Sequence, residues 1–403
     1  MVLARSTRKP TASASSALNR SACACGVRNP TSTAWKTDAR SGKQLNRAGR
    51  RPPLAEKACA PSHDNKGRVP LTESAPSGAI DVHTHIVPDH FPDGTGRDPR
   101  WPSVHHNDDG TAQIMIGGDV FRRLDRRSWD AESRIADMDA KGISHQVLSP
   151  MPELLSYWFD GDSALAMCET VNDVLAGLVA RHPDRFSGFG MVPLQTPERA
   201  VQELATLRSK GLTGVEIGTH VMGTPLGDPS LAPFFAEAAR LDMTVMVHAL
   251  HPVGAERIGN IPGIDATAIF PLETAMAAVS LMTSGVLETH PNSRILLSHG
   301  GGALPAILPR LDHAYRLGMP IQKCMSVPPS ELARRFFFDS IVYGDEALRY
   351  LATTVGAERM VVGTDYPFLV MEDDPVGFIQ RALPEDAAGL ILRQTAAPIV
   401  ARP

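Results

Sequence analysis

Two histidines, His83 and His85, stand one residue apart at the end of a short apolar run with the sequence IDVHTH (residues 80–85). In a β-strand, residues i and i+2 point to the same face, so both imidazoles can converge on one point at the strand end. That geometry suits metal ligands. The same short pattern also occurs in solvated loops, so the interpretation depends on whether further ligands follow.

Further metal-capable side chains end three later apolar segments. They are His248 in MTVMVHAL, His299 in ILLSHGGG and Asp365 in RMVVGTDYPF. The set His83, His85, His248 and Asp365 suits one borderline divalent ion, Zn²⁺ before Mn²⁺, and leaves a position for water or substrate. His299 then remains for proton transfer, since an imidazole with an ordinary pKa of about 6.5 can act on either side of neutrality.

The elements that must position these residues follow from the apolar pattern after residue 77. Strands are predicted at 79–82, 143–149, 186–192, 213–217, 244–248, 294–299, 336–340 and 360–363, and helices at 128–141, 162–181, 197–210, 231–241, 271–289, 303–315 and 345–354. Continuously apolar strands that alternate with helices indicate a parallel sheet covered on both faces, and eight such strands favour a closed (β/α)₈ barrel. A doubly wound open sheet is the competing fold, but no GxGxxG follows the first strand.

The first strand is followed by a gap of a different kind, at residues 86–127, which contains GTAQIMIGGDVFRRL. Residues 111–116 alternate in polarity before two glycines, which predicts a β-hairpin. We expect this insertion to lie over the barrel mouth, where the chemistry of such barrels sits, and to serve as a lid.

Charge divides the chain into two parts at residue 77. Residues 1–77 carry 14 Lys/Arg and 4 Asp/Glu, a net charge of +10, so residues 78–403 carry −14 of the total of −4. The first part lacks any apolar period and is predicted to be a disordered basic extension, and residues 78–403 are predicted to be the barrel. An organelle transit peptide, a start codon assigned too far upstream and a nucleic-acid-binding arm are its possible origins. No aromatic residues interleave the basic ones as stacking on bases would require, so no nucleic-acid partner is expected.

Apolar runs and cysteines indicate in which cellular compartment the protein is expected. No run of 18 apolar residues and no secretory signal is present, so neither a membrane span nor a membrane partner is expected. Only Cys168 and Cys324 fall in the barrel part, which favours a reducing, cytoplasmic location without structural disulfides.

Together these motifs resemble the amidohydrolase superfamily, and within it the aminocarboxymuconate-semialdehyde decarboxylase-like branch. The resemblance covers nearly everything from residue 80 onward. Beyond the HxH pair, it rests on FRRLDRRSWDAESRIADMDAKGI, VEIGTHVMG, SHGGGALPAILPRLDHA, RRFFFDS and GTDYPF. It implies that His83, His85, His248 and Asp365 bind the metal and that His299 is the acid/base.

Two arginines receive roles from the same resemblance. It implies that Arg122 binds a substrate carboxylate and that Arg310 enters the active site of a neighbouring subunit, which implies a homodimer. Binuclear relatives carry a carboxylated lysine after the fourth strand, whereas GVEIGTH offers Glu216 and His220, so one metal is expected. His220 is interpreted as a structural residue or as one that supports the ligands.

This chain departs from the muconate decarboxylases at a position that bears on substrate identity. The muconate decarboxylases follow the histidine of the fifth strand with Pro-Trp-Asp, whereas this chain continues His248-Ala249-Leu250-His251. We therefore expect a metal-dependent, non-oxidative decarboxylase of an aromatic or muconate-type carboxylic acid whose identity the motifs leave open. A hydrolase of a lactone, amide or C–C bond needs the same residues, and a non-catalytic binding protein with a relic site is the third reading.

Overall fold

The parallel sheet predicted for the barrel is present in the computed structural model, which describes residues 78–259, 261 and 263–401. Its strand order is β1 (Ala79–Ile86), β5 (Ile143–Pro150), β6 (Phe186–Gly190), β7 (Gly214–Gly218), β10 (Thr244–His248), β11 (Arg294–Leu297), β12 (Phe337–Asp339) and β13 (Met360–Val361). Two isolated parallel bridges, Asp81 to Val362 and Thr84 to Tyr366, connect the last strand to the first. The sheet therefore closes into the expected (β/α)₈ barrel. The predicted disorder of residues 1–77 lies outside the described residues.

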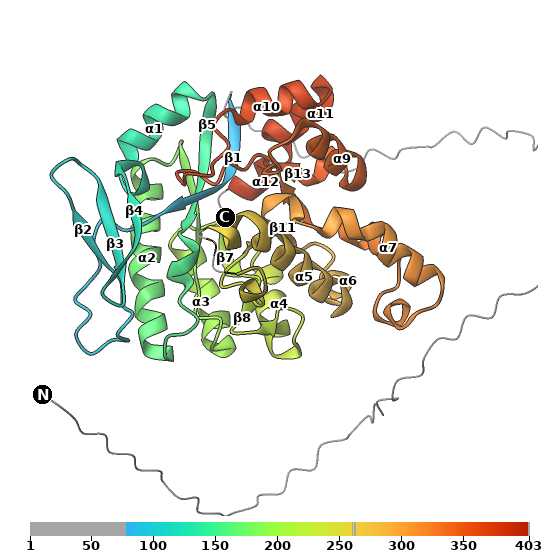
Figure 1. Cartoon of the computed structure of the whole chain (residues 1–403), viewed down its shortest axis with the longest axis horizontal. Helices are drawn as coiled ribbons and strands as arrows, with labels where there is room; N and C mark the ends of the chain where they lie inside the picture. Colours follow the sequence, from blue (N-terminus) through green and yellow to red (C-terminus); the bar gives the residue numbers. More distant parts are fainter. Residues whose placement is uncertain (1–77, 260, 262, 402–403) are drawn as a thin grey trace, which may run out of the picture. The chain divides into compact units, whose positions relative to one another are not determined.

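Helices connect consecutive strands and cover the outside of the sheet (Figure 1). The main ones are α1 (Ala131–Ala140), α2 (Gly161–Arg181), α3 (Pro197–Ser209), α4 (Ala232–Arg240), α5 (Phe270–Thr283), α7 (Leu304–Arg316) and α9 (Asp345–Val355). The segment predicted as one helix over 271–289 is divided into α5 and α6 (Val286–Thr289). Gly285 causes the break, because its φ of 82° is left-handed and cannot continue a right-handed helix.

Apolar side chains fill the barrel interior below the strand ends that carry the histidines. A buried cluster takes side chains from six of the eight strands together with Ala396 and Ile399: Ile80, Val82, Val147, Phe189, Met246, Leu296 and Val361. Ile399 belongs to the C-terminal α12 (Ala397–Val400), for which no helix was predicted. The chain end therefore contributes to the inner core, and the opposite, carboxyl end of the strands is left for polar groups.

The insertion after β1 forms a three-stranded antiparallel sheet instead of the expected two-stranded hairpin. The predicted hairpin corresponds to β3 (Ala112–Ile116) and β4 (Asp119–Leu124), and β2 (Ser103–His106) pairs with β3. The sequence SVHH gave no signal because β2 is mostly exposed and has no alternating apolar pattern. This sheet stands outside the barrel sheet (Figure 1).

Two helical segments pass a length and composition test for membrane spans, namely Gly161–Arg181 and Asp265–Thr283. Of their most apolar windows, 50% and 44% are buried within the fold. Helix α2 packs on β6, as a covering helix of a barrel does. Both segments are thus about half buried in the fold.

Candidate metal centre

Four side chains predicted as ligands meet at the carboxyl ends of the strands. His83 and His85 lie on β1, His248 is the last residue of β10, and Asp365 follows β13. All four are buried, and one potential ligand atom from each lies within 4.8 Å of the others. His83 Nε2 and His85 Nε2 are 3.1 Å apart, and Asp365 Oδ1 lies 3.1 Å from His85 Nε2. Strands far apart in the sequence thus bring their polar ends to one point.

The opposite ring nitrogens of the three histidines contact oxygen atoms. His83 Nδ1 lies 2.6 Å from Asp339 Oδ2, His85 Nδ1 lies 2.9 Å from the Pro150 carbonyl, and His248 Nδ1 lies 2.8 Å from the Ala249 carbonyl. Each Nδ1–H donates to its oxygen, so the proton stays on Nδ1 and each Nε2 is free to coordinate.

The fit to a metal ion can be tested on His248. Its Nε2 is buried and has no hydrogen-bond partner among the described residues, which is costly unless a ligand meets it. Three imidazole nitrogens and one carboxylate form a donor set that suits Zn²⁺ or a similar divalent ion. The residues therefore fit a metal centre.

Charges within the site favour a bound cation. Burial opposes ionisation of Asp365, but the hydrogen bond with His85 and the nearby His83 hold its pKa well below the ordinary value. Burial likewise acts to lower the pKa of His83, but the hydrogen bond and charge of Asp339 outweigh it and raise that pKa to about 9. Burial lowers the pKa of His248 well below its ordinary value, which keeps this imidazole neutral. The carboxylates thus favour positive charge in the pocket, held as a proton on His83 when no cation is bound, and a bound cation would displace that proton from Nε2.

His299 lies beside this set and not within it. Its Nε2 is 4.0 Å from Asp365 Oδ2, and its ring centroid is 5.0 Å from that of His248. Its Nδ1 is buried without a hydrogen-bond partner among the described residues, and burial lowers its pKa. A neutral imidazole next to a metal set can accept and return a proton, which is the role predicted for it.

Steric constraints explain why glycines follow His299. Residues 299 to 302 all have positive φ, with 55° at His299 and 58° at Gly302. A Cβ added at Gly302 would lie 1.9 Å from the Pro271 carbonyl oxygen, and one at Gly301 would lie 2.7 Å from the Phe338 ring. Only glycine allows the chain to turn this tightly between β11 and α7, so the SHGGG motif fixes the position of His299.

Two buried carboxylates support the histidines, and no role was predicted for either. Asp339 ends β12 and contacts His83 as described above. Glu216 lies in the middle of β7, and its Oε2 lies 3.7 Å from His85 Nδ1. Burial raises the pKa of Glu216 to about 7. The signal available in the sequence was the occurrence of an acidic residue within or directly after a strongly apolar strand.

Arg122 reaches the site from the insertion sheet. Its guanidinium carbon lies 4.3 Å from the ring centroid of Phe368, and the Phe368 ring stacks on His85. Its Nη2 lies 3.3 Å from Glu153 Oε1, just after the end of β5. Arg310 is exposed on α7, and no hydrogen bond or ion pair joins it to the metal set within the described part of the chain. The structure thus places Arg122 on the far side of the Phe368 ring from His85 and leaves Arg310 exposed on α7.

His220 and His251 lie outside the set of four and line a small pocket of their own together with Trp158. The Nε2–H of His220 donates to the His251 carbonyl at 3.0 Å, and its Nδ1 accepts from the Gly223 amide at 2.9 Å. With both nitrogens engaged, His220 holds the loop after β10 in place. The ring of His251 packs edge-on against Trp158, with centroids 4.5 Å apart.

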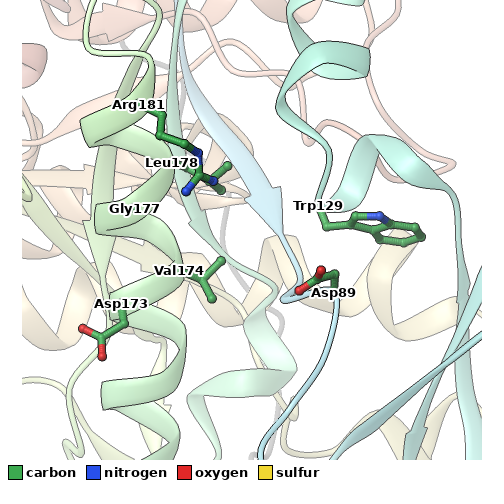
Figure 2. Close-up of a pocket in the computed structure, with 7 residues that line it drawn as sticks. All are labelled: Asp89, Trp129, Asp173, Val174, Gly177, Leu178 and Arg181. Atoms are coloured by element: carbon green, nitrogen blue, oxygen red, sulfur yellow. The ribbon is translucent and has the colours of Figure 1, made fainter.

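A cleft elsewhere on the barrel holds no comparable group of metal-capable side chains among the described residues. Its volume is about 240 Å³, and Figure 2 shows Asp173, Val174 and Leu178 of α2 on one side and Asp89 with Trp129 on the other. Asp173 pairs with Lys210 and Asp89 with His90. Because both carboxylates already have partners, this cleft is not the candidate site.

Comparison with known proteins defines the class of protein. Residues 80–400 match the family model described as amidohydrolase, and the chain belongs to this family. Among its relatives, the 2-amino-3-carboxymuconate-6-semialdehyde decarboxylase of Dictyostelium discoideum is 34% identical over 310 residues, which cover 75% of this chain and 85% of that protein.

Solved structures agree with this assignment. The 5-carboxyvanillate decarboxylase from Sphingomonas paucimobilis superimposes with a TM-score of 0.67 at 26% identity, covering 80% of this chain and 98% of that one. The 5-carboxyvanillate decarboxylase from Novosphingobium aromaticivorans, solved with manganese and 4-hydroxy-3-methoxy-5-nitrobenzoic acid, gives 0.60 at 27% identity, covering 67% of this chain and 80% of that one. The resemblance stated from the motifs is thereby confirmed.

Proposed function

We propose that this protein is a metal-dependent, non-oxidative decarboxylase that releases CO₂ from an aromatic or muconate-type carboxylic acid. The observation that carries the proposal is the buried set of His83, His85, His248 and Asp365 with His299 held beside it. The decarboxylase relatives support the same reaction class.

The proposed cofactor is one divalent ion per chain, bound by the three Nε2 atoms and the Asp365 carboxylate. Zn²⁺ is the first expectation from the donor set, and the manganese in a related structure makes Mn²⁺ the ion to test beside it. When bound, such an ion supplies Lewis-acid polarisation of a substrate oxygen.

The chain's own residues perform the proton transfer and hold the substrate. Loss of CO₂ from an sp² carbon is slow because the electron pair of the breaking bond is orthogonal to the π-system. His299, with Asp365 as the alternative carrier, takes up a proton from solvent water and delivers it to that carbon, which becomes tetrahedral. The C–C bond then breaks, its electron pair restores conjugation, and CO₂ leaves. Arg122 holds the substrate carboxylate through its planar fork of donors.

We further propose a homodimer in which Arg310 serves the neighbouring active site. The exposed position of Arg310 on α7 supports this, and so do two exposed apolar side chains that follow the helix, Leu317 at 65% and Met319 at 50% exposure. Mixing Arg310→Ala chains with His299→Ala chains should restore part of the activity if the arginine crosses between subunits.

We also propose a cytoplasmic location and an extension at residues 1–77 that is dispensable for activity.

The proposed reaction is tested by metal analysis together with a CO₂-release screen. The purified protein, loaded with Zn²⁺ or Mn²⁺, is incubated with hydroxybenzoates, aminobenzoates and carboxymuconates. Metal-dependent CO₂ with a product lacking one carboxyl group supports the decarboxylase. A product formed by addition of water without CO₂ would assign a hydrolase instead.

A further inference from the structure

The side chain of Asp339 accepts hydrogen bonds from four groups in three different segments. Oδ2 lies 2.6 Å from His83 Nδ1 and 2.8 Å from the His299 amide nitrogen. Oδ1 lies 2.7 Å from the Gly300 amide nitrogen and 3.0 Å from that of Ile341. The residue is fully buried. All four partners are N–H groups, so both oxygens of Asp339 act as acceptors and the site has no place for a donor on residue 339.

The contacts join two parts of the site that have separate tasks. His83 is a proposed metal ligand, and Asp339 orients its ring and fixes the tautomer. The turn that carries His299 has a strained residue, because His299 has a φ of 55° without being glycine. The amides that bind Asp339 are those of this residue and the next one, so the carboxylate holds the turn in the conformation that places the His299 ring.

We propose that Asp339 is a positioning residue that sets the distance between the metal and the proton-transfer group. One carboxylate fixes the ligand His83 through its ring and His299 through its backbone. Displacing it would therefore disturb metal binding and proton transfer together. The kinetic part of this inference rests on the proposed decarboxylase function, whereas the metal-binding part does not.

The discriminating variant is Asp339→Asn, which keeps the shape but places an NH₂ group against two N–H donors in either orientation. Ser340→Ala is the matched control, because Ser340 is also buried directly after β12, and its hydroxyl bonds to Gly363 and not to His83 or the His299 turn within the described residues. Metal dissociation constants are measured by equilibrium dialysis with Mn²⁺ and Zn²⁺, and kcat is measured at saturating metal across pH. Circular dichroism checks the fold.

For Asp339→Asn we expect metal affinity about tenfold to a hundredfold weaker, in line with other residues that support metal ligands. We also expect kcat at saturating metal to remain at least tenfold below that of the unaltered protein, with a shifted pH profile, whereas Ser340→Ala changes neither quantity. Full recovery of kcat at saturating metal would overturn the link to His299. Unchanged metal affinity would overturn the link to His83.

A second variant covers the case in which Asp339→Asn does not fold. Asp339→Glu keeps the charge but moves both oxygens by one methylene, so it cannot meet all four donors, and we expect both quantities to fall. Metal affinity and kcat equal to those of the unaltered protein would overturn the proposal. If the unaltered protein releases no CO₂ from any acid, the proposed function fails, while the dialysis measurement still decides whether Asp339 supports the metal site.

Discussion

The ring of Phe368 lies flat on the ring of His85, with centroids 4.9 Å apart and planes 17° from parallel. The Arg122 guanidinium is also in contact with the Phe368 ring. A residue of the insertion sheet is therefore connected to a candidate metal ligand through one aromatic ring. This contact sets the position of the proposed substrate-binding arginine relative to the candidate metal ligands.

Arg122→Ala should weaken substrate binding without removing the metal. The lost charge-assisted contact with the substrate carboxylate should raise KM by roughly tenfold to a hundredfold, unless that contact tightens in the transition state and lowers kcat instead. Arg123→Ala is the control, because neighbouring strand residues point to opposite faces and Arg123 is exposed. Equal effects of the two substitutions on kcat/KM would contradict the assignment.

Replacing His83 or His248 by Ala should lower bound metal well below one ion per chain. Each change removes one of four proposed ligands, and the remaining three bind more weakly. Metal content is measured by mass spectrometry after desalting, with His90→Ala as the control, because His90 is exposed on the surface. A variant that keeps full metal and full turnover would exclude that histidine from the ligand set.

His299→Ala should separate chemistry from metal binding. Because His299 lies outside the set of four, the variant should retain its metal while turnover falls by about a hundredfold or more, the usual size of a general acid/base contribution. Metal analysis and single-turnover CO₂ release give the two numbers. Loss of the metal, or near-normal turnover, would transfer the acid/base role to another residue.

Gly302→Ala should destabilise the fold more than Gly285→Ala does. Both glycines have left-handed φ, but an added Cβ meets the Pro271 carbonyl at Gly302 and has no atom within 4 Å at Gly285. Backbone strain alone costs about 1–2 kcal/mol. The clash at Gly302 should bring the loss to roughly 3 kcal/mol or more, as severe steric changes do. Urea unfolding of both variants measures the difference, and equal losses would show that the turn relaxes freely.

Deleting residues 1–77 should leave folding and turnover unchanged. The eight barrel strands, the proposed ligands and the acid/base group all lie between residues 79 and 365. Thermal unfolding and CO₂ release of the shortened protein are compared with those of the full chain. A shortened protein that aggregates or loses activity would show that the extension contributes to the barrel.

The barrel and the metal set could be predicted because their signals are local. Each strand is a short apolar run, and each ligand follows directly on its strand, so His248 and Asp365 were identifiable by type and place. The role of Asp339 could not be predicted in this way. Its four hydrogen bonds come from segments up to 256 residues away, and a single sequence contains no record of such contacts.

The insertion sheet and the last helix contain elements that the sequence pattern did not predict. Strand β2 is exposed, so no burial pattern records it, and its pairing with β3 depends on contacts formed only in the folded state. Ile399 lies in a short helix whose amphipathic period is too brief to detect. Exposed edges and short terminal segments thus depend on tertiary packing more than on sequence pattern.

The bridges from Asp81 to Val362 and from Thr84 to Tyr366 are the joint between the first and last strands of the barrel. Three of the four candidate ligands flank that joint, and His85 and Asp365 are 280 residues apart in the chain. The ligand set is therefore incomplete until the last strand has been made and has paired with the first. Binding of a metal ion by all four ligands is therefore expected only after the barrel has closed. A bound ion would then link the last strand of the barrel to the first.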